Sequence, residues 1–214
     1  MGIFKKQIKK KSWSDIKLYQ LQELDTLPTY EDELDLVINQ LSILLDEDSS
    51  DIENMPISEL LEEFKQWSFL KELPEEKNNL LIKVDGKQYG LIDFNKMTLG
   101  QMVDIEEYVS DGLMKNMHKI LSVLYLPVSS YNYITKKIVL ESYEPDKDRQ
   151  EMFLTLTMDI IYPQLLFFYH IVKVYIRNLA DSLKGMTPTH QMMTRIMNQV
   201  EELSVIQKHK QMIK

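Results

Sequence analysis

The side chains best suited to bind a metal or transfer a proton are the histidines and the adjacent carboxylate pairs of this chain. The histidines are His118, His170, His190 and His209. No two of them have the i, i+4 spacing that places two metal ligands on one helix face. Adjacent acids, at positions 62/63, 106/107 and 201/202, point in different directions on a helix and do not form an acid–base pair. Both groups are expected to be solvated or core residues.

Sites that depend on glycine or cysteine are also missing from the sequence. The phosphate-binding patterns G-x-x-x-x-G-K and G-x-G-x-x-G do not occur, nor does the G-x-S-x-G pattern of a nucleophilic serine. The acidic run 46–51 lacks the central glycine and the terminal glutamate of a calcium loop, so it is expected to be a solvated loop. The chain has no cysteine, which excludes thiolate catalysis and Cys-ligated zinc. The sequence therefore predicts a protein that is not an enzyme and has no cofactor or metal.

Charge is distributed in three blocks. Residues 1–12 contain five lysines and no acid, residues 13–76 contain eighteen acids and three lysines, and residues 77–214 are nearly neutral. The acidic middle block repels nucleic acid, so no nucleic-acid partner is expected unless the short lysine-rich arm acts alone. The simpler interpretation of residues 1–12 is a basic, disordered arm that aids solubility.

The composition favours helices. Of 214 residues only six are Gly and seven are Pro, while 44% are hydrophobic, enough for a sizeable core. We predict a mainly α, helical bundle-like fold with one small β-hairpin at residues 80–92. The most apolar stretch, residues 160–176, contains His170 and Lys173 and is expected to be a buried helix, without membrane association. The lack of a signal peptide and of cysteine is compatible with a cytoplasmic protein.

Apolar residues at helical spacing predict the positions of the helices. In the N-terminal half the expected helices are 16–27, 30–45 and 58–69, and in the last of these Leu60, Leu61, Phe64 and Trp67 are expected on one side. In the C-terminal half they are 99–109, 113–126, 146–184 (unbroken or divided near Pro163) and a final helix from Thr189. Residues 131–143 are expected to be a short helix or an extended segment, and residues 74–79 a linker.

A β-hairpin is predicted where the apolar period changes to two. Residues 80–84 and 87–92 flank Asp85-Gly86, a pair that tolerates the positive φ angles of a type I′ turn. This turn would place Ile82 opposite Tyr89 and Leu80 opposite Leu91. A single hairpin is marginal in water, so its apolar face must rest on helices.

A capping box is predicted at the start of the helix from Leu99. Thr98 is expected to cap the free amides of this helix, and Gln101 to reach back to Thr98.

The two halves of the sequence share a weak internal similarity, which we call the internal echo. At an offset of 81, residues 18, 20 and 24 align with 99, 101 and 105, and at an offset of 80, residues 41–44 align with 121–124. The echo indicates either a duplication or a chance match between helical patterns.

The sequence divides into four segments: a basic arm (1–12), an acidic helical subdomain (13–73), a hairpin plus helical subdomain (80–184) and a C-terminal amphipathic helix (187–214). The last segment carries a methionine-rich stripe, and methionine adapts to varied partner surfaces. Its candidate partner-binding residues are Met192, Met193, Ile196, Met197, Val200 and Leu203. The stripe is expected either to dock into a partner or to pack on the core of its own chain.

Three stretches together resemble a known group of proteins. They are residues 13–20 (WSDIKLYQ), 51–56 (DIENMP) and 97–106 (MTLGQMVDIE). They are similar to small proteins of tailed bacteriophages, including phages of Bacteroides and its relatives, described as tail-assembly-chaperone-like or virion-associated. The resemblance covers roughly residues 13–130 and includes no catalytic signature.

The resemblance implies a non-enzymatic tail or baseplate assembly protein that acts through protein–protein contacts. Its partners would be other phage structural proteins, and a homo-oligomer is a further possibility. It would be located in the host cytoplasm during assembly or in the virion. The alternative is a permanent virion component, such as a head–tail connector ring or a packaged internal protein. A third hypothesis is a regulator or an enzyme whose site is assembled from scattered carboxylates.

Overall fold

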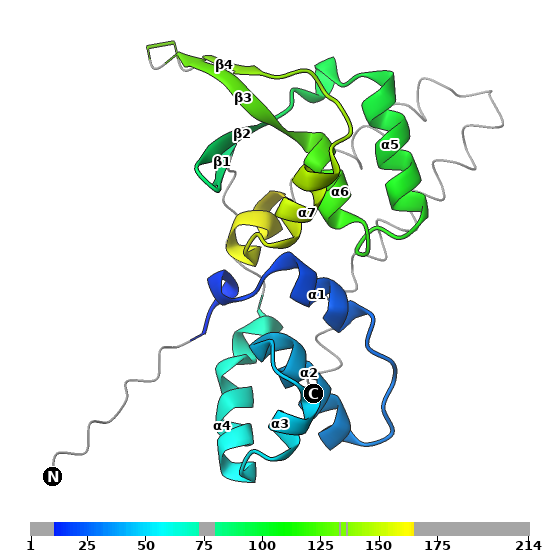
Figure 1. Cartoon of the computed structure of the whole chain (residues 1–214), viewed down its shortest axis with the longest axis vertical. Coiled ribbons are helices and arrows are strands. Elements are labelled where there is room, and N and C mark those ends of the chain that lie inside the picture. The colour runs from blue at the N-terminus through cyan, green and yellow to red at the C-terminus, as the bar shows by residue number, and fades with distance from the viewer. Residues whose placement is uncertain (1–10, 73–79, 133, 136, 165–214) are drawn as a thin grey trace, which may run out of the picture.

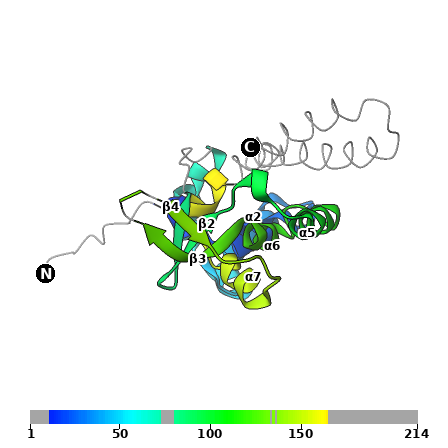
Figure 2. The ribbon, with the colours of Figure 1, turned by 90° about the horizontal axis from the view of Figure 1, so that it is seen from above.

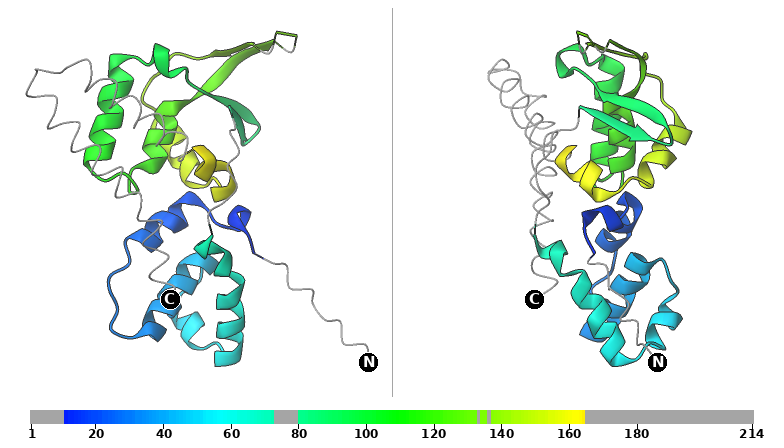
Figure 3. Two further views of the ribbon diagram at one scale, coloured as in Figure 1. Left: turned by 180° about the vertical axis from the view of Figure 1, so that it is seen from behind. Right: turned by 90° about the vertical axis from the view of Figure 1, so that its left-hand side faces the viewer.

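The computed structural model describes residues 11–72, 80–132, 134–135 and 137–164, and these form two lobes along the long axis of the molecule (Figure 1). One lobe contains α2, α3 and α4. The other contains a β-sheet with α5, α6 and α7. Helix α1 and the 3-10 helix η1 lie at the junction between the lobes, as two further views also show (Figure 3).

The N-terminal region is helical, as its apolar spacing predicts. Its elements are η1 (Trp13–Asp15), α1 (Leu18–Asp25), α2 (Glu33–Leu45), α3 (Ser49–Glu53), α4 (Ile57–Gln66) and η2 (Ser68–Lys71). The prediction of a loop at residues 46–51 is wrong in part. Asp46 ends α2 in the left-handed region with φ of 59°, but Ser49 begins the short helix α3, which the fully buried Ile52 attaches to the core.

The predicted hairpin is confirmed in position and register. Strand β1 (Leu81–Val84) pairs antiparallel with β2 (Lys87–Leu91), and Ile82 lies opposite Tyr89. Asp85 and Gly86 both have positive φ angles, 47° and 83°, as a type I′ turn requires. The N–H of Leu91 donates to the carbonyl of Leu80, in agreement with the predicted pairing of these two residues.

The predicted fold class is wrong, because the hairpin is half of a larger sheet. Strands β3 (Tyr125–Asn132) and β4 (Lys137–Leu140) complete a four-stranded antiparallel sheet in the order β1-β2-β3-β4. The described part of the chain is therefore a mixed α and β fold that is still mostly helical. The expected helix 113–126 is shorter, because its last residues pair with β2: Gly90 lies opposite Leu126 and Leu91 opposite Tyr125.

The remaining helices of this lobe are arranged around α6, which contacts β3 and packs against both α5 and α7. They are η3 (Phe94–Lys96), α5 (Leu99–Ser110), α6 (Met117–Leu124) and α7 (Lys147–Leu154), and residues 158–164 are helical again. The break in the expected helix 146–184 therefore falls at residues 155–157 and not near Pro163. Of residues 131–143, Tyr131 and Asn132 end β3 and residues 137–140 form β4, which is the extended form, the second of the two forms expected. Within the described ranges, no helix combines the length and hydropathy needed to cross a membrane.

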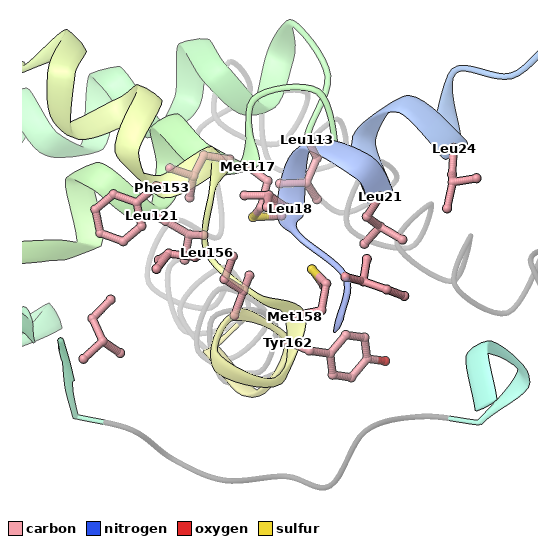
Figure 4. Close-up of a cluster of buried hydrophobic side chains, with 14 of the residues drawn as sticks. Leu18, Leu21, Leu24, Leu113, Met117, Leu121, Phe153, Leu156, Met158 and Tyr162 are labelled. Carbon is pink, nitrogen blue, oxygen red and sulfur yellow. The ribbon is translucent and has the colours of Figure 1, made fainter. Parts of the chain in front are cut away.

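The core at the junction of the lobes combines side chains from distant parts of the sequence (Figure 4). One buried cluster contains Leu18 and Leu21 of α1, Met117 and Leu121 of α6, and the apolar residues Phe153, Leu156, Met158 and Tyr162. Leu18 and Met117 have no exposed surface. Burial on this scale stabilises each such side chain by about 1.5–3 kcal/mol relative to exposure, so α1 is fastened to both lobes.

Two buried glutamines occupy the aligned positions of the internal echo and make the same contacts. Gln20 Oε1 accepts the N–H of Lys17 at 2.9 Å, and its Nε2 donates to the carbonyl of Ile43 at 2.9 Å. Gln101 Oε1 accepts the N–H of Thr98 at 3.0 Å. Its Nε2 donates to the carbonyl of Val123 at 3.3 Å. Each glutamine therefore joins the start of one helix to the end of the next, and Gln101 completes the predicted capping box.

A polar contact at His118 joins α1 to the lobe that contains the sheet. The Nε2 of Gln22 in α1 lies 2.7 Å from the carbonyl oxygen of Met114 and 3.2 Å from Nδ1 of His118. Burial, together with the smaller effect of the neighbouring charge of Lys119, lowers the pKa of His118 to about 4. The neutral ring is therefore the form that accepts a hydrogen bond from Gln22 at neutral pH.

We expect acidification to loosen this contact. Because the pKa of His118 is lower in the folded chain than the usual 6.5, the unfolded chain binds the proton first and stability falls as pH drops from about 6.5 towards 4. Between pH 7 and pH 5 the loss should be about 1 kcal/mol, reduced from the full shift because the ring is partly exposed. Urea unfolding at the two pH values should show this excess loss relative to His118→Gln. Equal losses in both proteins would contradict it.

Candidate protein-binding surface

The candidate metal ligands of the sequence do not cluster within the described residues. Among them, no group of three or more His, Asp or Glu side chains could hold a metal ion. Of the adjacent acids, Glu62 is exposed, whereas Glu63 is half-buried and accepts a hydrogen bond from Gln66. The six predicted partner-binding residues of the methionine stripe, from Met192 to Leu203, lie outside the described residues.

Exposed apolar side chains point to a different surface. Most stand singly, which is ordinary for protein surfaces. Two pairs are instead one helical turn apart and so share a helix face: Ile57 and Leu61 on α4, and Leu99 and Val103 on α5. The exposed fractions are 74% for Ile57 and 50% for Leu61, so neither contributes its full area to the core.

The α4 face consists of the exposed residues Ile57, Ser58, Leu61, Glu62 and Lys65. Pro56 precedes the helix, and the α4 sequence has apolar residues on two sides. Leu60 and Phe64 pack inward with Trp67, which leaves Ile57 and Leu61 facing solvent. The prediction that Leu61 shares the buried side with Leu60 is therefore wrong. A hundred degrees of rotation per residue separates the two side chains.

The surroundings of the α4 face are acidic. Glu53, Glu59 and Glu62 are exposed on or next to this helix. They belong to the block 13–76, which has a net charge of −15. A small apolar patch inside a strongly negative field attracts basic amphipathic segments and repels acidic ones.

Lys11 of this chain contacts the end of α4 through both a carboxylate and an aromatic ring. Nζ of Lys11 lies 3.8 Å from Oε1 of Glu63 and 4.8 Å from the centre of the Trp67 ring. The exposed fractions of the two charged side chains are 29% and 22%. A carboxylate beside an aromatic face attracts an ammonium group through both ion pairing and the ring quadrupole. Glu63 and Trp67 therefore already hold one lysine of this chain, next to the α4 face but outside it.

Sequence reasoning missed the α4 pair because it placed Leu61 on the buried side and began the helix after Ile57, and it assigned no face to the α5 pair. A signal was present in α4, where apolar residues at 57, 60, 61 and 64 cover more of the helix circumference than one buried stripe can include. In α5 the two exposed residues, Leu99 and Val103, follow the same spacing as core residues, so spacing alone does not distinguish them from core residues.

Comparison with known protein families, with characterised proteins and with solved structures finds no match to this chain.

Proposed function

We propose that this protein is a non-enzymatic assembly factor of a tailed bacteriophage that holds another phage structural protein through the α4 face. The observation that carries the proposal is the exposed pair Ile57 and Leu61 within a strongly acidic lobe. The phage context rests on the resemblance of residues 13–130. The partner segment that suits this face is a basic, amphipathic helix, which would bury the apolar pair and pair its lysines or arginines with the glutamates.

The test is capture from infected cells with two double variants of the intact chain. Ile57→Ser/Leu61→Ser removes the apolar patch, and Glu59→Lys/Glu62→Lys reverses two charges. We expect wild type to enrich one phage structural protein, and each variant to reduce that enrichment at least tenfold. The charge-reversal variant should lose mainly association rate and salt dependence, because rim charges act on encounter.

The matched control removes two other exposed apolar residues. Ile134→Ser/Val139→Ser changes the β3–β4 hairpin, where the exposed fractions are 94% and 44%. All three variants should unfold within about 0.5 kcal/mol of wild type, because the changed side chains are on the surface. Equal loss of partner in the control, or capture of host proteins alone, would overturn the proposal.

Mass spectrometry of purified particles separates an assembly factor from a permanent virion component. An assembly factor is released before the particle is complete, so the chain should be absent or far below stoichiometric amounts. A fixed copy number per virion would assign the α4 face to a permanent contact.

A further inference from the structure

The chain segments that lead into α1 and α5 have the same local structure at an offset of 81 residues. Each begins with a three-residue 3-10 helix, η1 or η3, and continues through two extended residues into an α-helix. The ψ angle is 132° at Ile16 and 130° at Met97, although the φ angles differ, at −115° and −58°. It is 159° at both Lys17 and Thr98. With the two buried glutamines, these segments form equivalent units.

In the first unit, another part of the chain covers the extended pair. Residues 156–158 run antiparallel to it and form a β-bridge. The N–H of Leu18 donates to the carbonyl of Leu156 at 2.9 Å, and the N–H of Met158 donates to the carbonyl of Ile16 at 2.8 Å. As a result, Ile16 and Leu18 have no exposed surface.

In the second unit the equivalent surface is open. Leu99, which aligns with Leu18, is 77% exposed, and Val103 one turn later is 50% exposed. Within the described ranges, no backbone hydrogen bond uses the N–H of Leu99 or the carbonyl of Met97, and no bridge forms at Thr98. Helix α5 lies on the side of α6 away from the sheet, at the edge of its lobe (Figures 1 and 2).

We propose that this second unit binds an extended segment of another protein in the way that the first unit binds residues 156–158. The bound segment would form an antiparallel bridge at Thr98, using the N–H of Leu99 and the carbonyl of Met97. Its side chains would cover Leu99 and Val103. This surface is separate from the α4 face and does not depend on the function proposed for it.

The first unit indicates the chemistry of the partner segment. Its occupant, Leu156-Thr157-Met158, has a small polar residue between two buried apolar ones. The partner should repeat this apolar, polar, apolar order in extended form, since only alternate side chains face the helix. Helix α5 contains three acids and no Lys or Arg, so acidic partner segments should be repelled.

The probe is a fluorescent peptide with the sequence of residues 152–160 and two lysines added at its C-terminus, mixed with the intact chain. We expect saturable binding, and an increase in Kd of at least tenfold for Leu99→Asp. Asp is well accommodated in the first turn of a helix, so this variant should remain folded. Val103→Asp should weaken binding in the same direction, whereas Ile134→Asp, which changes an even more exposed apolar residue, should bind like wild type.

Hydrogen exchange locates the bound peptide. Saturating peptide should slow exchange of the Leu99 amide at least tenfold and leave the Leu18 amide unchanged, because the latter is already bonded within the chain.

Absence of saturable binding, or equal binding to Leu99→Asp, would overturn the proposal. Binding that appears only after removal of residues 187–214 would overturn it by assigning the surface to the chain itself. A dimer that Leu99→Asp dissociates would overturn it by assigning the surface to a second copy. Variants of the α4 face should bind the peptide like wild type, so this test and that of the proposed function fail independently.

Discussion

Replacing Gln20 by leucine should lower the free energy of unfolding by about 2–4 kcal/mol, although leucine has a similar size. Gln20 is 5% exposed and joins the N–H of Lys17 to the carbonyls of Ile43 and Leu44. Leucine would leave these backbone groups buried without their partner, and an unsatisfied buried group costs about 1–3 kcal/mol. Urea unfolding monitored by circular dichroism measures the change.

The equivalent replacement Gln101→Leu should cost slightly less. Gln101 is 3% exposed and bonds to Thr98 and Val123, but Oγ1 of Thr98 also accepts the N–H of residue 101, and that cap survives the substitution. The control is Gln88→Leu on the exposed side of β2, which should change stability by less than about 0.5 kcal/mol. If the buried variants were as stable as this control, the glutamines would not join the helices.

The two buried replacements should be additive to within about 0.5 kcal/mol, because each glutamine bonds within its own helix pair. The pairs are α1 with α2 and α5 with α6. A double variant, Gln20→Leu/Gln101→Leu, tests this directly. A coupling much larger than 0.5 kcal/mol would show that the two helix pairs unfold through a shared structural change.

Local chemistry explains the parts of the fold that the sequence predicts correctly. The Asp85-Gly86 turn and the cap at Thr98 depend on residues within three or four positions of each other, so their residue types are sufficient. The same holds for α2, where acids and apolar residues alternate at helical spacing. The aligned glutamines also have a detectable signal, since each stands at the third position of its helix.

Long-range pairing explains what sequence reasoning missed. Every residue from Ile120 to Leu126 is buried and all but Ser122 are apolar, and such a run is equally suited to a buried helix and a buried strand. The change at Tyr125 is decided by pairing with β2, more than thirty residues earlier. The exposure of Leu99, in contrast to Leu18, is also non-local, because it depends on where residues 156–158 return.

The position of α7 rests on one aromatic residue that sequence reasoning did not single out. Phe153 has no exposed surface, and its ring centre lies 5.9 Å from that of Tyr89 in β2 and 6.3 Å from that of Tyr125 in β3. The hydroxyl of Tyr89 also reaches Sδ of Met152 at 3.5 Å. Phe153 therefore fastens α7 to two strands of the sheet.

Phe153→Ala should be the most destabilising single change, with a loss of about 3–5 kcal/mol from lost burial and the cavity that remains. Phe153→Leu, which keeps most of the volume, should lose about 1–1.5 kcal/mol. Both should shift the urea midpoint without changing the slope, since the folded state retains its exposed surface. Because α7 leads directly into residues 156–158, the alanine variant should also speed exchange of the Leu18 amide. Faster exchange at Leu18 with an unchanged midpoint would show that α7 opens locally and separately from the rest of the core.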